Sequence, residues 1–544
     1  MIYSVKQVIK LGNNILKYIF AIIVFGLVGF GIYEMKKDNT ITINEIVDQT
    51  STVNNIQTDL RLAICNFDTI NPILTNNRNV QEISKIIYDS LITLDETYKA
   101  KYCLADEVAK IDDLNYIIKL KKGILWQDGT PLTAYDVQFT IDMIKKTLPE
   151  NKIYTIYSNN LEAVSYLEIL DENTLKLSLQ YPVDFFEYNL TFPILSQKYY
   201  ENENFITTEK NINPVGTGMF KIESVDSNVI KLIKNDIYWN LSKSPMVNEI
   251  NINLYSSAGE LYNSFKNGEI DILDVKIDNV EDYIGSIGYK KIEYKSRDYD
   301  FLAFNTQNQI FSDKSVRKAI SKLLDKNNIV ATCLGNGYIQ SNFSLDMGNW
   351  LYTKNLNIES NVDEAKQILI ENGWEYKNNK WRKKFDNKVL ELTFVLSVNE
   401  NNKNRLLVAE NIKKQLANFG INIIIRQLNN ETYSKYINER NFDMIIAGIE
   451  CGFSPSLKTF FGDNNLANYS NDEIRGIMNI ISNTSDENTL YENYSKLYDI
   501  YLEDAPYIGL YRNTDIVVYN QGLIGNVKAN SFNLYCNIEK WYRQ

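Results

Sequence analysis

The chain has 544 residues and a formal net charge of −11, and its sequence contains no histidine. The length predicts two or three lobes, and the negative charge argues against nucleic acid, whose phosphates need clustered lysine and arginine. Without histidine, Ser-His-Asp and Cys-His catalysis, histidine-ligated metals and the histidine pH switch are excluded.

The first element in chain order is a predicted membrane segment. Residues 18–33 carry no charge, and Lys6, Lys10 and Lys17 precede them without any acidic residue. Such an excess of positive charge places the amino terminus in the cytoplasm and the rest of the chain outside the cell. A signal peptide cleaved at a small-x-small site in residues 29–31 is the alternative, and it would give a secreted protein.

We therefore expect residues 1–37 to form a cytoplasmic basic end and a signal-anchor in the cell membrane. Residues 38–58 are polar and predict a tether. The folded part begins near Asp59, where residues 60–64 alternate as in a strand. The first cysteine is Cys65, so there is no lipobox cysteine, and no pair among the five cysteines has the Cys-x-x-Cys spacing of a zinc or redox site.

Residues 123–137 predict a turn followed by a helix. Asp128 and Gly129 form a turn pair, and Pro131 stops a strand from continuing. Thr133 and Asp136 have the spacing of a capping box. The helix that they open carries four regularly spaced apolar residues: Val137, Ile141, Ile144 and Leu148.

Residues 392–449 alternate between predicted strands and helices. Strands are expected at 392–398, 421–428 and 442–449, with helices at 403–419 and 431–440 between them. This order implies right-handed crossovers and a largely parallel sheet with helices on its faces. Ligands bind such sheets beyond the carboxyl ends of the strands, which here points to residues 447–453.

Residues 123–137 are also similar to a signature of the extracytoplasmic oligopeptide-binding proteins, the solute-binding protein family 5 of ABC transporters. Its Trp-x-Asp-Gly-x-Pro core is much more specific than a lone glycine motif. Further stretches resemble the family, in the family's own order, between residues 60 and 541. They are 71–72, 83–91, 213–222, 234–239, 266–272, 301–306, 313–325, 365–374 and 502–511.

The resemblance implies an α/β fold, a bilobed clamshell of the periplasmic-binding-protein kind with an extra inserted lobe. Three lobes are thus expected, preceded by the one N-terminal transmembrane segment. The lobes would close on a ligand held between them. The expected boundaries are 59–95, 206–297 and 520–544 for a discontinuous lobe I, 96–205 for the inserted lobe II, and 298–519 for lobe III.

Most of the matching residues are expected to be scaffold. Gly216 and Gly218 predict a tight turn where backbone approaches backbone. We expect Trp126 to pack within the protein and not to touch a ligand. Arg317 is likewise expected to be a structural ion-pair partner and not a ligand contact. One face of the helix in residues 313–325 should be buried: Val316, Ala319, Ile320, Leu323 and Leu324.

The chain departs from the family where the peptide amine is held. Relatives continue an Ala-Gly pair with Trp-x-x-Asp, whereas here Ile449 stands for the tryptophan and Gly452 for the aspartate. Glu450 would point to the same side of an extended strand as Gly452, so it is a candidate substitute for the anchor. A solvated Glu450 is the equal alternative. Ile446 replaces an arginine that often precedes the motif, so capture of an ordinary free peptide is not implied.

Other site residues are expected from their positions in the family pattern. Asn76, Asn77 and Arg78 lie in the loop that lines the site in relatives, where Arg78 would meet a ligand carboxylate or stay solvated. Tyr154 and Tyr157 resemble aromatic residues that cover the ligand. The remaining candidates are Asn305, beside the cleft, and the residues after Glu450: Cys451, Gly452 and Phe453.

The expected function is capture of oligopeptides outside the cytoplasm and their delivery to ABC permease subunits. An extended peptide has an unpaired donor and acceptor at every residue, so strand addition with roomy side-chain pockets is predicted. We expect a monomer that is not an enzyme and needs no cofactor or metal.

Abundant Asn, Ile, Lys and Tyr suggest an AT-rich bacterial genome, and the anchored topology suits a Gram-positive bacterium. Two alternatives stay open: a tethered peptide-sensing receptor without transport, and an extracellular hydrolase, against which the absence of histidine argues.

Overall fold

The computed structural model describes residues 58–275, 284, 288–386 and 388–544. The predicted signal-anchor at residues 1–37 and the tether up to residue 57 lie outside the described residues. None of the helices in the described part of the chain is long and apolar enough to cross a membrane. Residues Thr58 to Arg543 form one compact unit.

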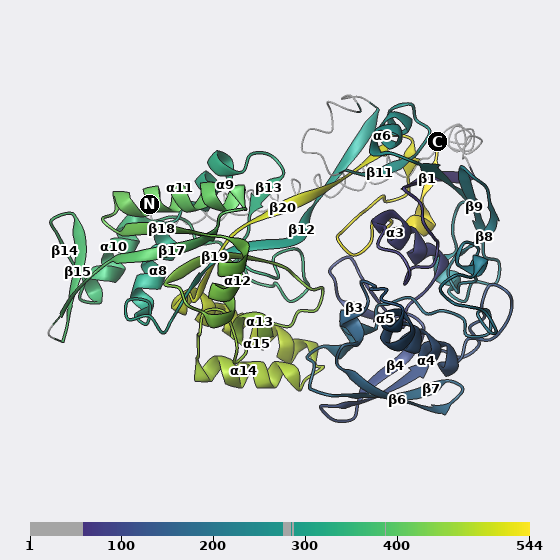
Figure 1. The fold of residues 1–544 in the computed structure, drawn as a ribbon, viewed down its shortest axis with the longest axis horizontal. Helices are drawn as coiled ribbons and strands as arrows, with labels where there is room; N and C mark the ends of the chain where they lie inside the picture. Colours follow the sequence, from purple (N-terminus) through teal and green to yellow (C-terminus); the bar gives the residue numbers. More distant parts are fainter. Residues whose placement is uncertain (1–57, 276–283, 285–287, 387) are drawn as a thin grey trace, which may run out of the picture. The chain divides into compact units, whose positions relative to one another are not determined.

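The folded part begins with the edge strand of a four-stranded sheet (Figure 1). Its order is β1 (Asp59–Cys65), β10 (Glu249–Tyr255), β9 (Val229–Lys234) and β8 (Phe220–Val225). β1 runs parallel to β10, and the other neighbours are antiparallel. Leu60, Leu62 and Ile64 are fully buried, which confirms the strand predicted at residues 60–64. The helices α3 (Arg78–Ile87) and α6 (Ala258–Lys266) pack against β1.

A second four-stranded sheet is formed by residues 105–179. Its antiparallel order is β4 (Ala105–Lys110), β5 (Asn115–Leu120), β7 (Thr174–Leu179) and β6 (Val164–Asp171). The capping box predicted before α4 (Ala134–Asp142) is present, and the Thr133 N–H donates to Asp136 Oδ2 at 2.8 Å. Helical structure continues to α5 (Leu148–Glu150). The four apolar residues predicted for this helix are buried: Val137, Ile141, Ile144 and Leu148.

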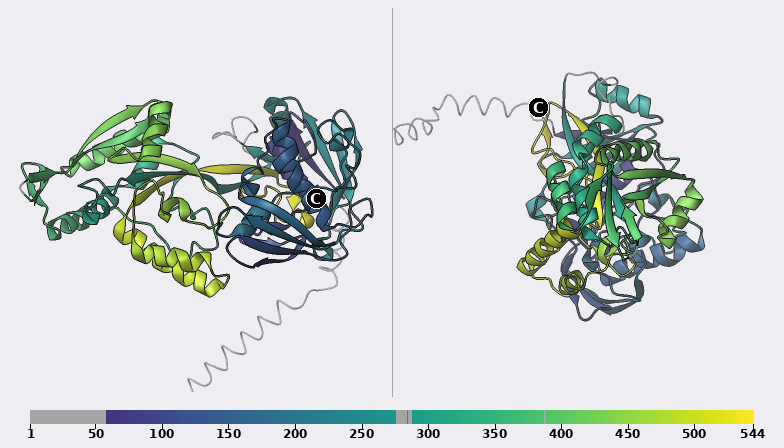
Figure 2. Two further views of the ribbon diagram at one scale, coloured as in Figure 1. Left: turned by 60° about the horizontal axis from the view of Figure 1, so that its bottom comes forward. Right: turned by 90° about the vertical axis from the view of Figure 1, so that its left-hand side faces the viewer.

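The largest sheet has seven strands and joins distant parts of the chain. Its order is β11 (Ile272–Val275), β20 (Tyr507–Asn520), β12 (Tyr289–Phe304), β19 (Met444–Glu450), β17 (Thr393–Asn399) and β18 (Asn422–Leu428), and β13 (Tyr338–Gln340) also pairs with β20. Figure 1 and Figure 2 show β20, in yellow, running along β12, in teal. The strands and helices predicted between residues 392 and 449 are confirmed, with α11 (Lys403–Asn418) and α12 (Asn430–Glu439) as the helices.

The prediction of a largely parallel sheet is wrong for the sheet as a whole. β17 pairs in parallel with β18 and β19, as the crossover pattern requires. However, β12 runs antiparallel to β19 and β20, and β11 runs antiparallel to β20. The alternating pattern covered only residues 392–449, and the direction of strands that pair across hundreds of residues is not encoded locally.

The last residues of β12 and the first residues of β19 are buried on both faces of this sheet and separate two hydrophobic cores. Phe301 and Ala447 belong to one core, whereas their neighbours Leu302 and Ile446 belong to the other. This alternation follows from the two-residue period of a strand. The remaining helices are α8 (Lys314–Leu323), α9 (Lys326–Cys333), α10 (Val362–Glu371), α13 (Lys458–Phe461), α14 (Asp472–Ser482) and α15 (Glu487–Asp504). The remaining strands are β2 (Ile92–Leu94), β3 (Ala100–Tyr102), β14 (Glu375–Lys377), β15 (Lys380–Phe385), β16 (Lys388–Glu391), β21 (Leu523–Ile524) and β22 (Tyr542–Arg543).

The residues predicted as scaffold are buried. Trp126 is 1% exposed, and the predicted apolar face of α8 lies in the core. Arg317 is also structural, but its partners are main-chain carbonyls: its Nε donates to Asp504 O at 2.8 Å and its Nη1 to Phe311 O at 2.5 Å. Arg317 is thus structural, as predicted, but the predicted ion pair is wrong, because its hydrogen bonds go to main-chain carbonyl oxygens.

Two of the matched motifs lie against each other at the end of α3. The Gln127 N–H donates to Gly216 O, and the Gly216 N–H donates to Gln127 Oε1 at 2.8 Å. A Cβ on Gly216 would lie 1.9 Å from Ile87 O, and one on Gly218 would lie 2.6 Å from Ile86 O. Both glycines therefore allow the close backbone contact that the sequence predicted.

We expect Gly216→Ala to lower the free energy of unfolding by about 1–3 kcal/mol, because the added methyl group has no space. Gly476→Ala is the matched control, since nothing lies within 4 Å of the Cβ that it adds in α14. This helical substitution should raise the free energy of unfolding by about 0.5–1 kcal/mol. Urea denaturation of the two variants measures both values, and equal effects would contradict the close contact at Gly216.

Candidate functional site

A cavity of about 940 Å³ is lined by segments that lie far apart in the sequence. It has polar, charged and aromatic walls. The lining residues are Arg78, Gln81, Glu82, Lys85, Ile156, Tyr157, Asn159, Asn160, Tyr188, Asn189, Thr191, Ser296, Arg297, Asp298, Glu450, Gly452, Phe453, Ser454, Asn513, Asp515, Ser531 and Phe532. Its size lies within the range of about 300–1,000 Å³ that is usual for ligand sites.

One wall is formed where β12 leaves its register with β20. The pairing shifts between Lys295 and Tyr299, so Ser296, Arg297 and Asp298 are not opposite any residue of β20 in the strand register. Such bulges bend a strand and redirect its side chains. The bulge therefore turns this stretch of β12 toward the cavity, beside the carboxyl end of β19.

Arg297 connects this wall to the segment after β19. Its Nη1 lies 3.0 Å from Glu450 Oε1, and its Nε donates to Cys451 O at 2.7 Å. Its guanidinium lies 4.5 Å from the centre of the Phe453 ring. These contacts place the Glu450 carboxylate and the Phe453 ring side by side on the cavity wall. Glu450 was predicted either to anchor the ligand or to be solvated. It lines the cavity, and its side chain is also 64% exposed.

Helix α3 supplies a second, charged wall. Arg78, Gln81, Glu82 and Lys85 recur at the spacing of one helical face. Arg78 Nε lies 3.5 Å from Asp274 Oδ2, and its Nη2 donates to Tyr294 Oη at 3.4 Å. Burial alone would lower the pKa of the Arg78 guanidinium, but the nearby Asp274 and Tyr294 raise it above its ordinary value. Arg78 therefore stays charged at the cavity.

Five of the ten predicted site residues line this cavity: Arg78, Tyr157, Glu450, Gly452 and Phe453. The Tyr157 hydroxyl is buried, which raises its pKa, with a smaller contribution from Glu82, so it is neutral and can donate. The structure brings these residues together from segments that are hundreds of residues apart.

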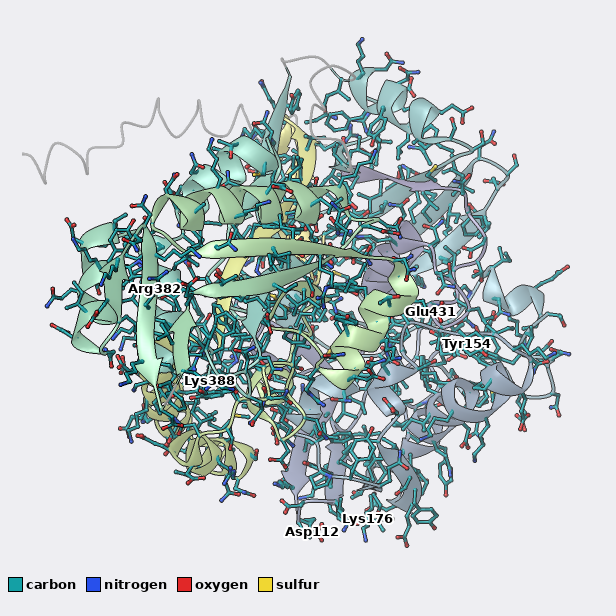
Figure 3. All side chains as sticks on the ribbon, turned by 60° about the vertical axis from the view of Figure 1, so that its left-hand side comes forward. Asp112, Tyr154, Lys176, Arg382, Lys388 and Glu431 are labelled. Carbon is teal, nitrogen blue, oxygen red and sulfur yellow. The ribbon has the colours of Figure 1, made fainter. Side chains whose placement is uncertain are left out.

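The other five do not line it. Asn77 caps α3, its side chain accepting from the Asn79 N–H at 3.0 Å, and Asn76 precedes it. Tyr154 is 77% exposed on the surface (Figure 3). Cys451 is buried behind the wall. Asn305 lines a separate cavity of about 270 Å³, because it follows the far end of β12, seven residues and roughly 23 Å along the strand from Asp298.

Sequence reasoning missed several lining residues. Gln81, Glu82 and Lys85 could have been found from their regular spacing after Arg78, which puts all four on one face of α3, although Arg78 was expected to lie in a loop. Asp298 could not have been predicted as a lining residue, because its position depends on the bulge in β12. Phe532 comes from the carboxyl-terminal segment, and no local pattern marks it.

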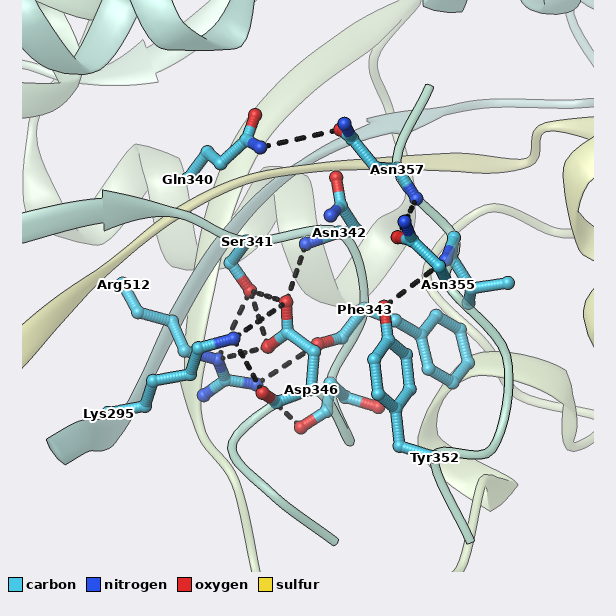
Figure 4. A network of polar contacts seen from close by, with 12 residues as sticks. Lys295, Gln340, Ser341, Asn342, Phe343, Asp346, Tyr352, Asn355, Asn357 and Arg512 are labelled. Carbon is cyan, nitrogen blue, oxygen red and sulfur yellow. Dashed lines mark hydrogen bonds and ion pairs between the residues drawn. The ribbon is translucent and has the colours of Figure 1, made fainter. Parts of the chain in front are cut away.

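A buried arginine holds the sheet wall from behind. Arg512, on β20, is fully buried, and its Nε donates to Asp346 Oδ1 at 2.9 Å (Figure 4). Its Nη1 donates to Ser296 O and Arg297 O, each at 3.2 Å. Its Nη2 donates to Ser344 O at 2.5 Å and lies 3.6 Å from Cys451 Sγ. One side chain thus fixes the bulge of β12, the end of β19 and the loop around residue 346.

Burial shifts the pKa values of several groups around Arg512. Burial alone would lower the pKa of the Arg512 guanidinium, but Cys451 and Asp346 raise it above its ordinary value. Burial raises the pKa of the Cys451 thiol, and Arg512 offsets this in part, so the thiol stays protonated. Burial also lowers the pKa of the nearby Lys326 ammonium to about 8, although Asp346 acts in the opposite direction.

We expect Arg512→Met to lower the free energy of unfolding by about 3–5 kcal/mol, because it leaves Asp346 buried without its main partner. The control is Arg475→Met, which breaks an exposed pair with Asp472 and should cost only about 0.2–1 kcal/mol. The double variant Arg512→Met with Asp346→Leu should recover part of the loss, since the buried carboxylate that lacked Arg512 is gone; the recovery is incomplete because Lys295 and Lys326 lose the same carboxylate. Urea denaturation measures all three, and a single-variant loss as small as that of the control would refute the role of Arg512.

The Lys326 ammonium predicts a pH dependence of stability. Its folded pKa of about 8 lies below the unfolded value of 10.5, so the unfolded chain binds more protons between these two values. The cost of burying the charge is therefore complete below pH 8 and disappears as the pH rises toward 10.5, at up to about 1.4 kcal/mol per pH unit. Relative to Lys326→Met, the wild type should gain stability from pH 8 to 10. A constant difference between the two proteins over this range would contradict the prediction.

Comparisons with known proteins place the cavity in a family context. The family described as bacterial extracellular solute-binding proteins, family 5 Middle, matches residues 99–468. The oligopeptide-binding protein AppA of Bacillus subtilis (strain 168) is 27% identical over 482 residues, which cover 85% of this chain and 87% of AppA.

Solved structures show a similar fold. The structure of AppA from Bacillus subtilis in complex with a nonapeptide is similar with a TM-score of 0.51 and 25% identity, covering 89% of this chain and 99% of that one. The periplasmic murein tripeptide-binding protein MppA, in its unliganded open form, has a TM-score of 0.73 at 18% identity and shares the fold over 90% of this chain and 97% of its own. Because the family match spans well over half of the chain, this protein belongs to the bacterial extracellular solute-binding proteins of family 5.

Proposed function

We propose that this protein is the substrate-binding component of an ABC importer that captures oligopeptides and delivers them to a membrane permease. The observation that carries the proposal is the cavity of about 940 Å³, built from segments at both ends and in the middle of the chain. The similarity to AppA, whose structure holds a nonapeptide, supports peptide as the ligand class.

The lining supports recognition of a peptide backbone. Amide side chains recur around the cavity, and each can both donate and accept hydrogen bonds. Gln81, Asn160 and Asn189 each donate one hydrogen bond to a main-chain carbonyl of the protein. The remaining amide N–H and C=O groups match the alternating groups of an extended peptide without depending on its sequence. The lining amides are Gln81, Asn159, Asn160, Asn189 and Asn513.

The finer parts of the proposal concern topology and movement. Residues 1–37 would anchor the chain in the membrane, with residues 38–58 as a tether and the rest outside the cell; cleavage in residues 29–31 would instead release it. The lobes would be 59–95, 206–297 and 520–544 for lobe I, 96–205 for lobe II and 298–519 for lobe III. A ligand would shift the monomeric protein toward a closed state by as much as it prefers that state.

The test is capture of peptides by the full-length protein in native mass spectrometry. We expect short peptides to be retained from a library, and to raise the free energy of unfolding by about 2.7 kcal/mol at one hundred times the dissociation constant. Gly452→Trp should lower capture at least about tenfold, because the ring would fill the cavity. Nothing beside Gly452 obstructs a side chain, since the closest atom to an added Cβ is 3.9 Å away.

Gly476→Trp is the matched control, because nothing lies within 4 Å of a Cβ added at Gly476 and this residue does not line the cavity. It should capture peptides as the wild type does. If the wild type retains no peptide, or if Gly452→Trp binds as well as the control, the proposed function is wrong. Loss of peptide uptake when the chain is deleted from its host would separate import from sensing without transport.

A further inference from the structure

A second cavity, of about 330 Å³, adjoins the first along the strand pair β12 and β19. Three residues line both cavities: Asp298, Glu450 and Asn513. The second cavity lies at the carboxyl end of β19, over the middle of β12, and beside the start of α11, where Asn402 and Asn404 contribute to its lining. It has room for roughly ten water molecules at about 30 Å³ each, and hence for a short piece of a ligand.

The floor of the second cavity is a partly buried ion pair. Arg405 Nε lies 2.5 Å from Asp300 Oδ1. A Cβ on Gly448 would lie 2.0 Å from Arg405 Nη2 and 2.7 Å from Asp300 Oδ1, so only glycine lets this pair lie flat on the sheet. Because the pair is internally neutralised, it supplies hydrogen-bonding groups to the cavity without adding net charge.

The ridge between the two cavities is acidic. Asp298 and Glu450 are direct partners in the register of β12 and β19, so their side chains lie on the same face. Arg297 pairs with Glu450 at 3.0 Å. In the part of the chain that the structure describes, no cation lies within ion-pair distance of Asp298, which is exposed to the cavity.

The cationic residues of the cavities are already paired. Arg78 lies 3.5 Å from Asp274, and Lys85 lies 2.9 Å from Glu82. Arg297 and Arg405 are held by Glu450 and Asp300. A ligand cation therefore finds the carboxylate of Asp298 available on the ridge, whereas a ligand anion must compete with carboxylates for each base.

We propose that the two cavities form one extended ligand site, in which Asp298, assisted by Glu450, binds a cationic group lying inside the ligand rather than at its end. A cation held on the ridge leaves a cavity on each side for the rest of the ligand. The ligand class is a peptide with an internal basic side chain such as lysine. This inference rests on the proposed function of peptide capture.

The test uses three sets of short synthetic peptides, with capture by the full-length protein measured by native mass spectrometry in competition. Peptides of the first set are acetylated at the amino end, amidated at the carboxyl end and carry one internal lysine. The second set is the same with norleucine in place of lysine. The third set has a free amino terminus and no lysine. We expect the first set to be captured at least about tenfold better than the second, because the ammonium forms a charge-assisted hydrogen bond.

Three variants locate the effect. Asp298→Asn should abolish the preference for lysine over norleucine, whereas Asp106→Asn, which removes an exposed carboxylate on β4 outside both cavities, should keep it. Asn404→Trp should fill the second cavity and lower capture of the first set while Asp298 stays in place. Thermal unfolding of each variant establishes that it is folded.

The outcomes are distinct. Equal capture of lysine and norleucine peptides, an unchanged preference in Asp298→Asn, or unchanged capture by Asn404→Trp would overturn the extended site. Capture of the third set alone would mean a terminal amine anchor, which overturns the inference and leaves the proposed function standing. If no set is captured by the wild type, the proposed function itself fails.

Discussion

The hydrogen bonds of one buried guanidinium determine the geometry of this protein's cavity. Arg512 is fully buried, and burying a charge costs several kcal/mol unless every donor is used. The acceptors of its hydrogen bonds are Asp346, carbonyl oxygens of the β12 bulge and of the loop at residue 344, and the Cys451 sulfur. The planar, forked shape of arginine suits such a set of acceptors, which a lysine could not contact together. The positions of three separate segments thus depend on one side chain.

The cavity wall follows from this constraint. Because Arg512 holds the carbonyl groups of Ser296 and Arg297, β12 bulges there and its next residue, Asp298, faces Glu450 across the strand pair. Two carboxylates on neighbouring strands repel each other, and Arg297 offsets only one of them. The wall of the cavity therefore carries an acidic ridge, formed by Asp298 and Glu450 on neighbouring strands.

Local patterns predicted local structure well. The capping box at Thr133 and Asp136, the strand and helix order between residues 392 and 449, and the buried face of α8 all appear as predicted, because each depends on contacts within a few turns or strands. The parallel pairing of β17 with β18 and β19 followed from the length of the helical crossovers. The antiparallel pairing of β12 and β20 could not be predicted in this way, since these strands are separated by about two hundred residues in the chain.

The sequence by itself determined the family, the scaffold motifs and the absence of histidine chemistry, because these depend on residue types in a fixed order. It also pointed to the carboxyl end of β19, where Glu450, Gly452 and Phe453 do line the cavity. Only the tertiary structure decided which residues join them. Asn305 follows the end of β12 that lies away from the cavity. Asp298 lines the cavity because β12 bulges there, and Phe532 lines it from the carboxyl-terminal segment. The lining of a cavity between distant segments depends on the long-range register of strands and on the partners of buried charges. Neither can be recognised from residues that are neighbours in the sequence.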